Sequence, residues 1–440
     1  MQVADVPALD RIASEAERLL ARSPADATLV TWIERRRGTA RESARARRAD
    51  LVDEREVIVR VRVAGRTGGA RTESAAPADL ERALRAALAA ARAETPSPDW
   101  DAAASAGAVT DLPGLFDPAL AELEPAGAQR ELELRAERRA TIDLDWREER
   151  IVVAASFHPL RTVRLTAASA AVRTGRRPGS GFAARSARTL AELDLEQLVA
   201  RARALEAPES VAEAPGRPLP LVLSPEVSAA LIEAWARLAL SARGARETAA
   251  PAALARAVTL DDEPFAARGL PLPFDLDGSP RARRRFVEGG RVLGAAFDLE
   301  LAARAGTVPT GHGLASDDAW PVHLALAPGA VGEEELLRHA AGGLRVGAVE
   351  HLSVREGDAA LVFHAVARNV RRIGADGALG TGLAPLAWNG SLAAVLAAVE
   401  EVGRETVTWS PRPGLPGATT GTALRLAAAA GFEPLGGARS

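Results

Sequence analysis

The chain contains no cysteine in its 440 residues, and this absence removes several kinds of chemistry at once. Disulfide bonds, thiolate zinc sites, iron–sulfur clusters and cysteine nucleophiles are all excluded. Tyrosine and lysine are absent too, and the one methionine is Met1. These gaps leave few of the usual nucleophiles and acid–base groups for catalysis. The lack of cysteine is compatible with a cytoplasmic location, which we expect.

Long apolar runs are also missing from the chain. No stretch of about 18 apolar residues occurs, so we expect no membrane-spanning helix. The N-terminal segment has charges throughout and lacks the apolar core of a secretory signal. The net charge is −3, and the arginine runs at 35–37, 47–48 and 283–285 lie close to acidic residues. We interpret these runs as solvated surface and expect neither a nucleic-acid nor a membrane partner.

The length of the chain predicts two or three domains. The clearest boundary is a stretch rich in proline and glycine between Ala207 and Pro218, which is typical of a linker. We therefore predict an N-terminal α/β domain at 1–100. A central domain with an antiparallel meander and the linker follows at 101–217, and a β-rich C-terminal domain at 218–440.

Hydrophobic periodicity predicts the elements of the first half. The predicted helices cover 7–22, 77–94, 118–137 and 194–205, and the predicted strands cover 27–34, 51–63, 141–146, 149–156 and 162–172. Residues 179–182 are predicted to form a turn.

The second half opens with a predicted strand at 219–223. A helix follows, with Ser224 as its N-cap and Pro225 in its first turn, and we expect it to run to Arg243 and stop at Gly244. Further helices are predicted at 332–341 and 390–403, and a strand at 406–410. The fold class is therefore mixed α/β (α+β). We expect N-terminal helices packed on a mixed sheet, and a C-terminal domain rich in curved antiparallel strands.

Four motifs in this order resemble the TldD/PmbA family, whose members are also called modulators of DNA gyrase. The motifs are VRVAGRTGGART at 61–72; VTLDD at 258–262 with PFDLDGSPR at 273–281 and VEGGRVL at 287–293; AARAGTVPTGH at 302–312; and GLAPLAWNGSL at 382–392. Together they extend over nearly the whole chain. The resemblance implies a metallopeptidase assembly in which a TldD-like subunit binds zinc through a HExxxH helix and a later cysteine. A PmbA/TldE-like subunit, which has no metal site, completes the heterodimer.

The residues at the zinc-helix position place this chain with the second kind of subunit. The six residues are Ile232-Glu233-Ala234-Trp235-Ala236-Arg237. Ile232 and Arg237 replace the two histidines, and neither an alkyl group nor a guanidinium can bind Zn²⁺. The third ligand is lost with the absence of cysteine. Glu233 remains where the catalytic base would lie, but we interpret it as an ordinary helix ion pair with Arg237.

Other candidate sites are weaker. His351 and His364, with Asp358 between them, are the least unfavourable alternative metal ligands, although strand histidines are usually structural. His312 in a Gly-His-Gly loop could contact a peptide or a carboxylate, but a simple turn is the preferred interpretation. The segment 275–279 resembles the start of a calcium loop, and Phe286 at its twelfth position rules that out.

No phosphate-binding loop follows the glycines at 65, 68 and 69, and no G-x-S-x-G elbow occurs. We therefore expect no metal, no cofactor and no catalytic residue. The sequence does not identify the residues that bind substrate.

The function that this sequence favours is a zinc-less, non-catalytic subunit of a TldD/TldE-like heterodimer that helps bind and process peptides. Its partners would be a zinc-bearing TldD-like subunit and a peptide substrate. A stand-alone peptide-binding protein, or a metal-independent homodimeric enzyme, is the alternative. A direct role in DNA topology, suggested by the older family name, conflicts with the net charge of −3.

Overall fold

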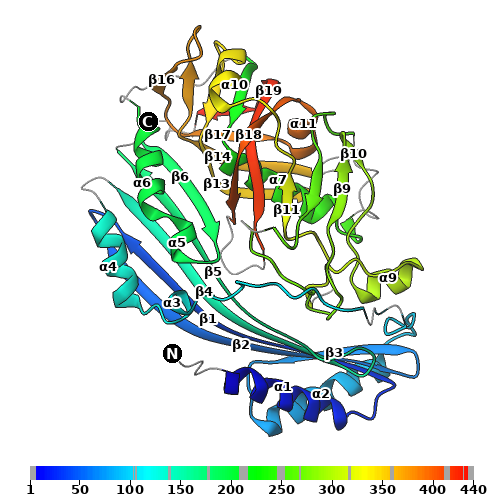
Figure 1. The fold of residues 1–440 in the computed structure, drawn as a ribbon. Coiled ribbons are helices and arrows are strands. Elements are labelled where there is room, and N and C mark those ends of the chain that lie inside the picture. The colour runs from blue at the N-terminus through cyan, green and yellow to red at the C-terminus, as the bar shows by residue number, and fades with distance from the viewer. Residues whose placement is uncertain are drawn as a thin grey trace, which may run out of the picture.

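The protein is described from a computed structural model in which the strands form three sheets and the helices pack beside them (Figure 1). The mixed α+β class is confirmed, with 25% of the chain in helices and 41% in strands. The structure describes residues 6–102, 104, 107–136, 140–175, 179–207, 217–244, 253–266, 269–315, 319–356, 361–410, 417–429 and 431–434. Most of the predicted linker, 208–216, lies outside these residues.

The first half builds one long six-stranded sheet in the order β3-β2-β1-β4-β5-β6. Its strands are β1 (Ala27–Glu42), β2 (Arg47–Val63), β3 (Arg66–Thr72), β4 (Thr141–Ala155), β5 (Arg161–Thr174) and β6 (Gly181–Ala187). Every neighbouring pair is antiparallel, which corrects the expected mixed sheet. Short connections impose this pairing on β1–β2, β2–β3, β4–β5 and β5–β6, because parallel neighbours would need a crossover of a dozen or more residues. β1 and β4 lie far apart in the chain and are antiparallel as well.

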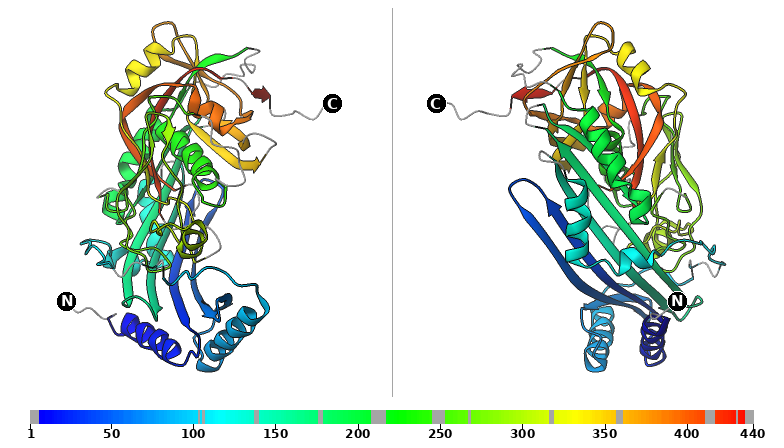
Figure 2. Two further views of the ribbon diagram at one scale, coloured as in Figure 1. Left: turned by 90° about the vertical axis from the view of Figure 1, so that its right-hand side faces the viewer. Right: turned by 60° about the vertical axis from the view of Figure 1, so that its left-hand side comes forward.

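Among the described residues, the helices that accompany this sheet are α1 (Val6–Ala21), α2 (Pro77–Ala93), α3 (Pro118–Ala121), α4 (Pro125–Arg135), α5 (Leu190–Leu193) and α6 (Leu195–Ala204). Side chains alternate between the two faces of a strand, so residues of equal parity on β1 share a face. On β1, Val30 and Trp32 pack in the cluster formed with α1 and α2, while Ala40 packs in the cluster formed with α3, α4 and α6. The same face is therefore covered by helices at both ends (Figure 2).

The opposite face of the sheet packs against the second half of the chain. Leu29, Ile33 and Val153 share an apolar cluster with Phe274 and Leu276, which lie in the loops after β8. This contact joins the two halves through a continuous core.

The second half contains a ten-stranded and a four-stranded sheet. The larger sheet has β7 (Leu219–Leu223), β8 (Leu260–Asp262), β9 (Arg284–Glu288), β10 (Arg291–Val292), β11 (Leu324–Leu326), β12 (Leu344–Val346), β15 (Arg371–Ile373), β16 (Leu379–Gly382), β18 (Val399–Trp409) and β19 (Thr419–Ala429). The smaller sheet has β13 (Ala348–Glu356), β14 (Leu361–Arg368), β17 (Leu386–Ser391) and β20 (Phe432–Pro434). The helices are α7 (Pro225–Ala239), α9 (Leu299–Ala305), α10 (Glu333–His339) and α11 (Leu392–Ala397). Most pairings are antiparallel, and β7 with β12 and β11 with β19 are parallel.

Several predicted boundaries are wrong in detail. The helix expected at 118–137 is two helices, because Pro125 starts a new one. The strands expected at 141–146 and 149–156 are the single strand β4, and the turn expected at 179–182 includes the start of β6. The helix expected at 390–403 ends at Ala397, where β18 begins and pairs with β19. The six-stranded sheet takes strands from both sides of residue 100, and the three-domain division stays a prediction.

Candidate functional site

Helix α7 occupies the position that the family resemblance assigns to the zinc helix. It follows β7, and the Ser224 hydroxyl accepts a hydrogen bond from the Val227 amide (3.3 Å), as an N-cap should. The helix packs on β18 and β19 and is buried along most of its length. It ends at Ala239 rather than Arg243, because Ser241 and Ala242 pair with the segment around Ala296.

The three residues singled out on α7 differ in their surroundings. Ile232 is completely buried in the large apolar cluster of the second half. Glu233 and Arg237 are partly exposed. The i, i+4 ion pair between them stays a prediction. The Ile232 side chain has no lone pair, and the Arg237 guanidinium bears a fixed positive charge, so these two positions do not fit a zinc ion.

The alternative metal ligands do not lie opposite one another. The strand partner of His364 is Ser353, because a bulge shifts the register of β13 and β14 beyond Glu350. His351 lies within this bulge with a φ of 54°. The Nδ1 atom of His364 lies 2.7 Å from the Asn389 side-chain oxygen, and Asp358 lies outside the described residues. Within the described ranges, no three His, Cys, Asp or Glu side chains gather in a way that could hold a metal ion.

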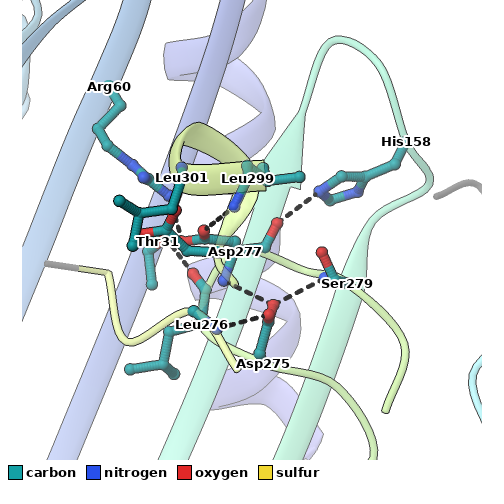
Figure 3. A network of polar contacts seen from close by, with 11 residues as sticks. Thr31, Arg60, His158, Asp275, Leu276, Asp277, Ser279, Leu299 and Leu301 are labelled. Atoms are coloured by element: carbon teal, nitrogen blue, oxygen red, sulfur yellow. Dashed lines mark hydrogen bonds and ion pairs between the residues drawn. The ribbon is translucent and has the colours of Figure 1, made fainter. Parts of the chain in front are cut away.

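The segment 275–279 forms a buried polar cluster between the two halves of the chain, which we call the Asp277 cluster (Figure 3). The Asp277 carboxylate lies between two elements: it pairs with Arg60 of β2 and accepts a hydrogen bond from the Leu299 amide of α9 (3.3 Å). Thr31 of β1 donates its hydroxyl to the Leu276 carbonyl (2.8 Å). The cluster therefore ties the six-stranded sheet to the second half.

Asp275 stabilises the loop of this cluster from within. Its carboxylate accepts hydrogen bonds from the amides of Asp277 (3.0 Å), Ser279 (2.8 Å) and Gly313 (2.7 Å). Gly278 has a φ of 82° and lies against the His158 ring, where a Cβ atom would clash. The motif that resembles a calcium loop is thus a loop closed by its own amides.

Burial and neighbouring charge alter the acidity of this cluster. Burial raises the pKa of Asp275, and the negative charge of Asp277 raises it further. Burial and the negative charge of Asp277 also raise the pKa of Asp298. Asp298 caps α9 by accepting a hydrogen bond from the Leu301 amide (2.6 Å). Arg60 pairs with Asp277 and also acts on Asp298, but the pKa values of Asp275 and Asp298 still lie above the ordinary range for aspartate.

A second buried group, the Asp262 cluster, consists of Asp262, Arg281, His312 and His323. The Asp262 carboxylate lies 2.7 Å from Arg281 and 3.3 Å from the His312 ring, and it accepts the His323 amide (3.1 Å). Burial alone would raise the pKa of Asp262, but Arg281 and His312 outweigh burial and hold it well below its usual range. Burial lowers the pKa of His323 to about 3 and also lowers that of His312. His312 is 1% exposed, so it is not the accessible peptide contact considered from the sequence.

Sequence reasoning missed both clusters because it tested the Asp and His residues one motif at a time. The available signal was their order, since Asp262, Asp275, Asp277, His312 and the glycines beside them all fall in the family-like motifs. The side chains are buried and their acceptors are occupied by amides and guanidinium groups. The chemistry of the Asp277 cluster therefore suits holding the two halves together, and that of the Asp262 cluster suits stabilising the second half, rather than acting on a substrate.

Comparison with known proteins agrees with the motifs. Residues 215–430 match the model of the PmbA/TldA metallopeptidase C-terminal domain. This matched segment of the chain includes α7. The chain belongs to the PmbA/TldD metallopeptidase family. No curated protein gives a match.

Solved structures share the whole fold of this PmbA/TldD member. TldE from Thermococcus kodakarensis superimposes with a TM-score of 0.77 at 17% identity, covering 96% of this chain and 98% of that one. A putative modulator of a DNA gyrase from Thermotoga maritima gives 0.75 at 18% identity, with 95% and 99% coverage. A similar protein from Bacteroides thetaiotaomicron gives 0.71 at 15% identity, with 96% and 99% coverage. No helix among the described residues is both long and apolar enough to span a membrane.

Proposed function

We propose that this chain is the zinc-less subunit of a TldD/TldE-like metallopeptidase heterodimer and helps hold peptides that a zinc-bearing partner cleaves. The observation that supports this most directly is the chemistry of α7, where Ile232 and Arg237 stand at the two histidine positions. The absence of cysteine removes the third ligand as well. The full-length likeness to a TldE structure agrees with this assignment.

The packing of α7 supports a structural use of the former site. Ile232 lies in the same apolar cluster as Leu221, Trp235 and Phe363. A side chain enclosed in this way contributes to the core and offers no surface to a substrate. Glu233 lies at the position of a catalytic base. With no metal ion beside it, its partly exposed carboxylate contributes only to the surface of α7.

The test is co-expression of this chain with a TldD-like chain that has an intact HExxxH helix. We expect a stable heterodimer by native mass spectrometry, with peptide cleavage that a chelator abolishes, and no zinc in this chain alone. Glu233→Ala in the assembled complex should leave cleavage unchanged, whereas the matched Glu→Ala change in the partner should abolish it. Chelator-sensitive cleavage by this chain alone would contradict the proposal. The proposal also includes a cytoplasmic location for this subunit.

A further inference from the structure

The helix-covered face of the six-stranded sheet has a charged middle zone between its two apolar ends. At both ends of this face the side chains are apolar, but between them β1 places Glu34 and Arg36 and β4 places Glu148 and Arg150. A groove of about 1290 Å³ lies over this zone, with the segment around α3 as one wall. It also reaches the four consecutive residues 53–56 of β2, which include both faces of that strand. The groove therefore opens at the side of β2.

This side of β2 is a free strand edge. β3 stops at Thr72, which pairs with Val57, and among the described residues only β1 pairs with β2 from Arg47 to Glu56. We call this stretch, 47–56, the β2 edge. At this end of the sheet the β1–β2 hairpin therefore extends well past the end of β3.

The hairpin turn between β2 and β3 fixes which backbone groups of this edge point outward. Ala64 and Gly65 both have positive φ, 50° and 72°, as in a two-residue turn of type I′. The residues that flank such a turn, Val63 and Arg66, exchange hydrogen bonds, and bonded positions then recur at every second residue. Val57 therefore points its backbone groups at β3. With the same alternation, Arg55 and Asp53 point theirs to the side where β3 is absent.

Charge decides what kind of segment suits this edge. Eight carboxylates and six guanidinium groups line the groove. All six arginines form ion pairs, for example Arg55 with Glu34 (2.8 Å) and Arg164 with Glu148 (2.8 Å). Four exposed carboxylates have no ion-pair partner among the described residues. They are Asp53, Glu54, Glu73 and Glu122. The surplus in the groove is therefore negative.

We infer that the β2 edge and its groove bind an extended peptide with lysine or arginine side chains, which adds a strand beside β2 in line with β3. The peptide backbone pairs with the outward groups of Asp53 and Arg55, as in other cases of strand addition. Asp53 and Glu54 lie on opposite faces of the sheet, so basic side chains at neighbouring peptide positions meet a carboxylate on each face. This assignment rests on the proposed peptide-binding role and locates it.

The binding test uses this chain alone and fluorescein-labelled acetyl-(Lys-Val)4-amide, measured by fluorescence anisotropy. We expect saturable binding that weakens as salt rises from about 50 to about 300 mM. The matched (Glu-Val)4 peptide should bind at least about tenfold more weakly. A (Lys-Val)4 peptide with N-methyl groups at alternate residues keeps its charge but loses strand donors. Its affinity should also fall about tenfold or more. This comparison needs no variant of the protein.

Two variants of one residue separate backbone pairing from charge. Asp53→Pro removes the outward amide without touching the β1 ladder, since proline is tolerated on a strand edge. It should weaken binding more than Asp53→Ala, which removes only the carboxylate. Glu17→Lys, on the exposed face of α1, is the control that should leave binding unchanged.

Three outcomes would overturn the assignment. They are equal binding of both charge types, no effect of N-methylation, or a change in oligomeric state with Asp53→Pro in a protein that binds no peptide. The last would make the edge an interface between chains. None of them affects the co-expression result, so failure here is distinguishable from failure of the proposed heterodimer.

Discussion

The molecule contains two sets of carboxylates that differ in almost every respect. Those of the Asp262 and Asp277 clusters are buried, and each accepts hydrogen bonds or pairs with arginine. Those at the β2 edge, such as Asp53 and Glu54, are exposed. A buried carboxylate without partners would destabilise the fold, whereas an exposed one is nearly free of cost. The first set is therefore explained by stability, and the second set is available for binding.

The largest expected effect comes from removing a buried carboxylate. Asp262→Ala leaves Arg281, which is 4% exposed, without its counterion and should lower the free energy of unfolding by about 3–5 kcal/mol. Urea unfolding followed by tryptophan fluorescence measures the loss. Arg283→Ala removes an ion pair of Asp261 whose arginine side chain is 62% exposed, and it should cost far less. Equal losses for the two variants would contradict the contrast between buried and exposed pairs.

The second prediction extends the contrast to α7. Ile232→His places a polar ring in a closed apolar cluster and should cost about 2–4 kcal/mol. Ile232→Val, which keeps the site apolar, should cost about 1 kcal/mol. The same unfolding experiment compares them. If Ile232→His were as stable as the wild type, this position would be open enough to hold a ligand, and the packing argument would fail.

The third prediction concerns pH. The pKa of Asp298 is raised, so the folded state holds a proton that the unfolded state releases above its ordinary pKa of about 4. The stabilisation that this retained proton gives the folded state is fully present below about pH 4, and it is lost as the pH rises through the raised pKa of Asp298. Asp298→Asn should therefore reduce the decline in unfolding free energy between about pH 5 and pH 8, by on the order of 1 kcal/mol. An unchanged decline would show that Asp298 does not retain the proton.

The smallest expected effect belongs to the β2 edge. Replacing both Asp53 and Glu54 by lysine should leave the urea midpoint within experimental error of the wild type, because both side chains are exposed and neither has an ion pair among the described residues. The same double variant should lose binding of the basic peptide. A clear fall in stability would instead mean that these carboxylates serve the fold.

Local signals in the sequence located the elements better than their ends. Ser224 and Pro225 fixed the start of α7, because capping depends on neighbouring residues. Its end, and the change from α11 to β18 at Val399, depend on pairing with Ala296 and Leu426, which are far away in the chain. Long-range pairing of this kind overrides local helix preference.

The charged groove lay beyond sequence analysis for a related reason. Its members come from five strands and the segment around α3, and each charge alone resembles ordinary surface. The run at Arg35 to Arg37 was interpreted as solvated, yet its arginines pair with Glu149, Glu124 and Asp145 from later elements. The loss of the zinc ligands, by contrast, depends only on which residues stand at 232 and 237 and on the absence of cysteine, and it stays a prediction.

The most direct test of the central claim is cleavage by the co-expressed pair. We predict a heterodimer with a TldD-like subunit whose peptide cleavage is lost with a chelator, and which requires the partner's HExxxH glutamate but not Glu233 of this chain. Cleavage that survives loss of the partner's glutamate and disappears with Glu233→Ala would contradict the account.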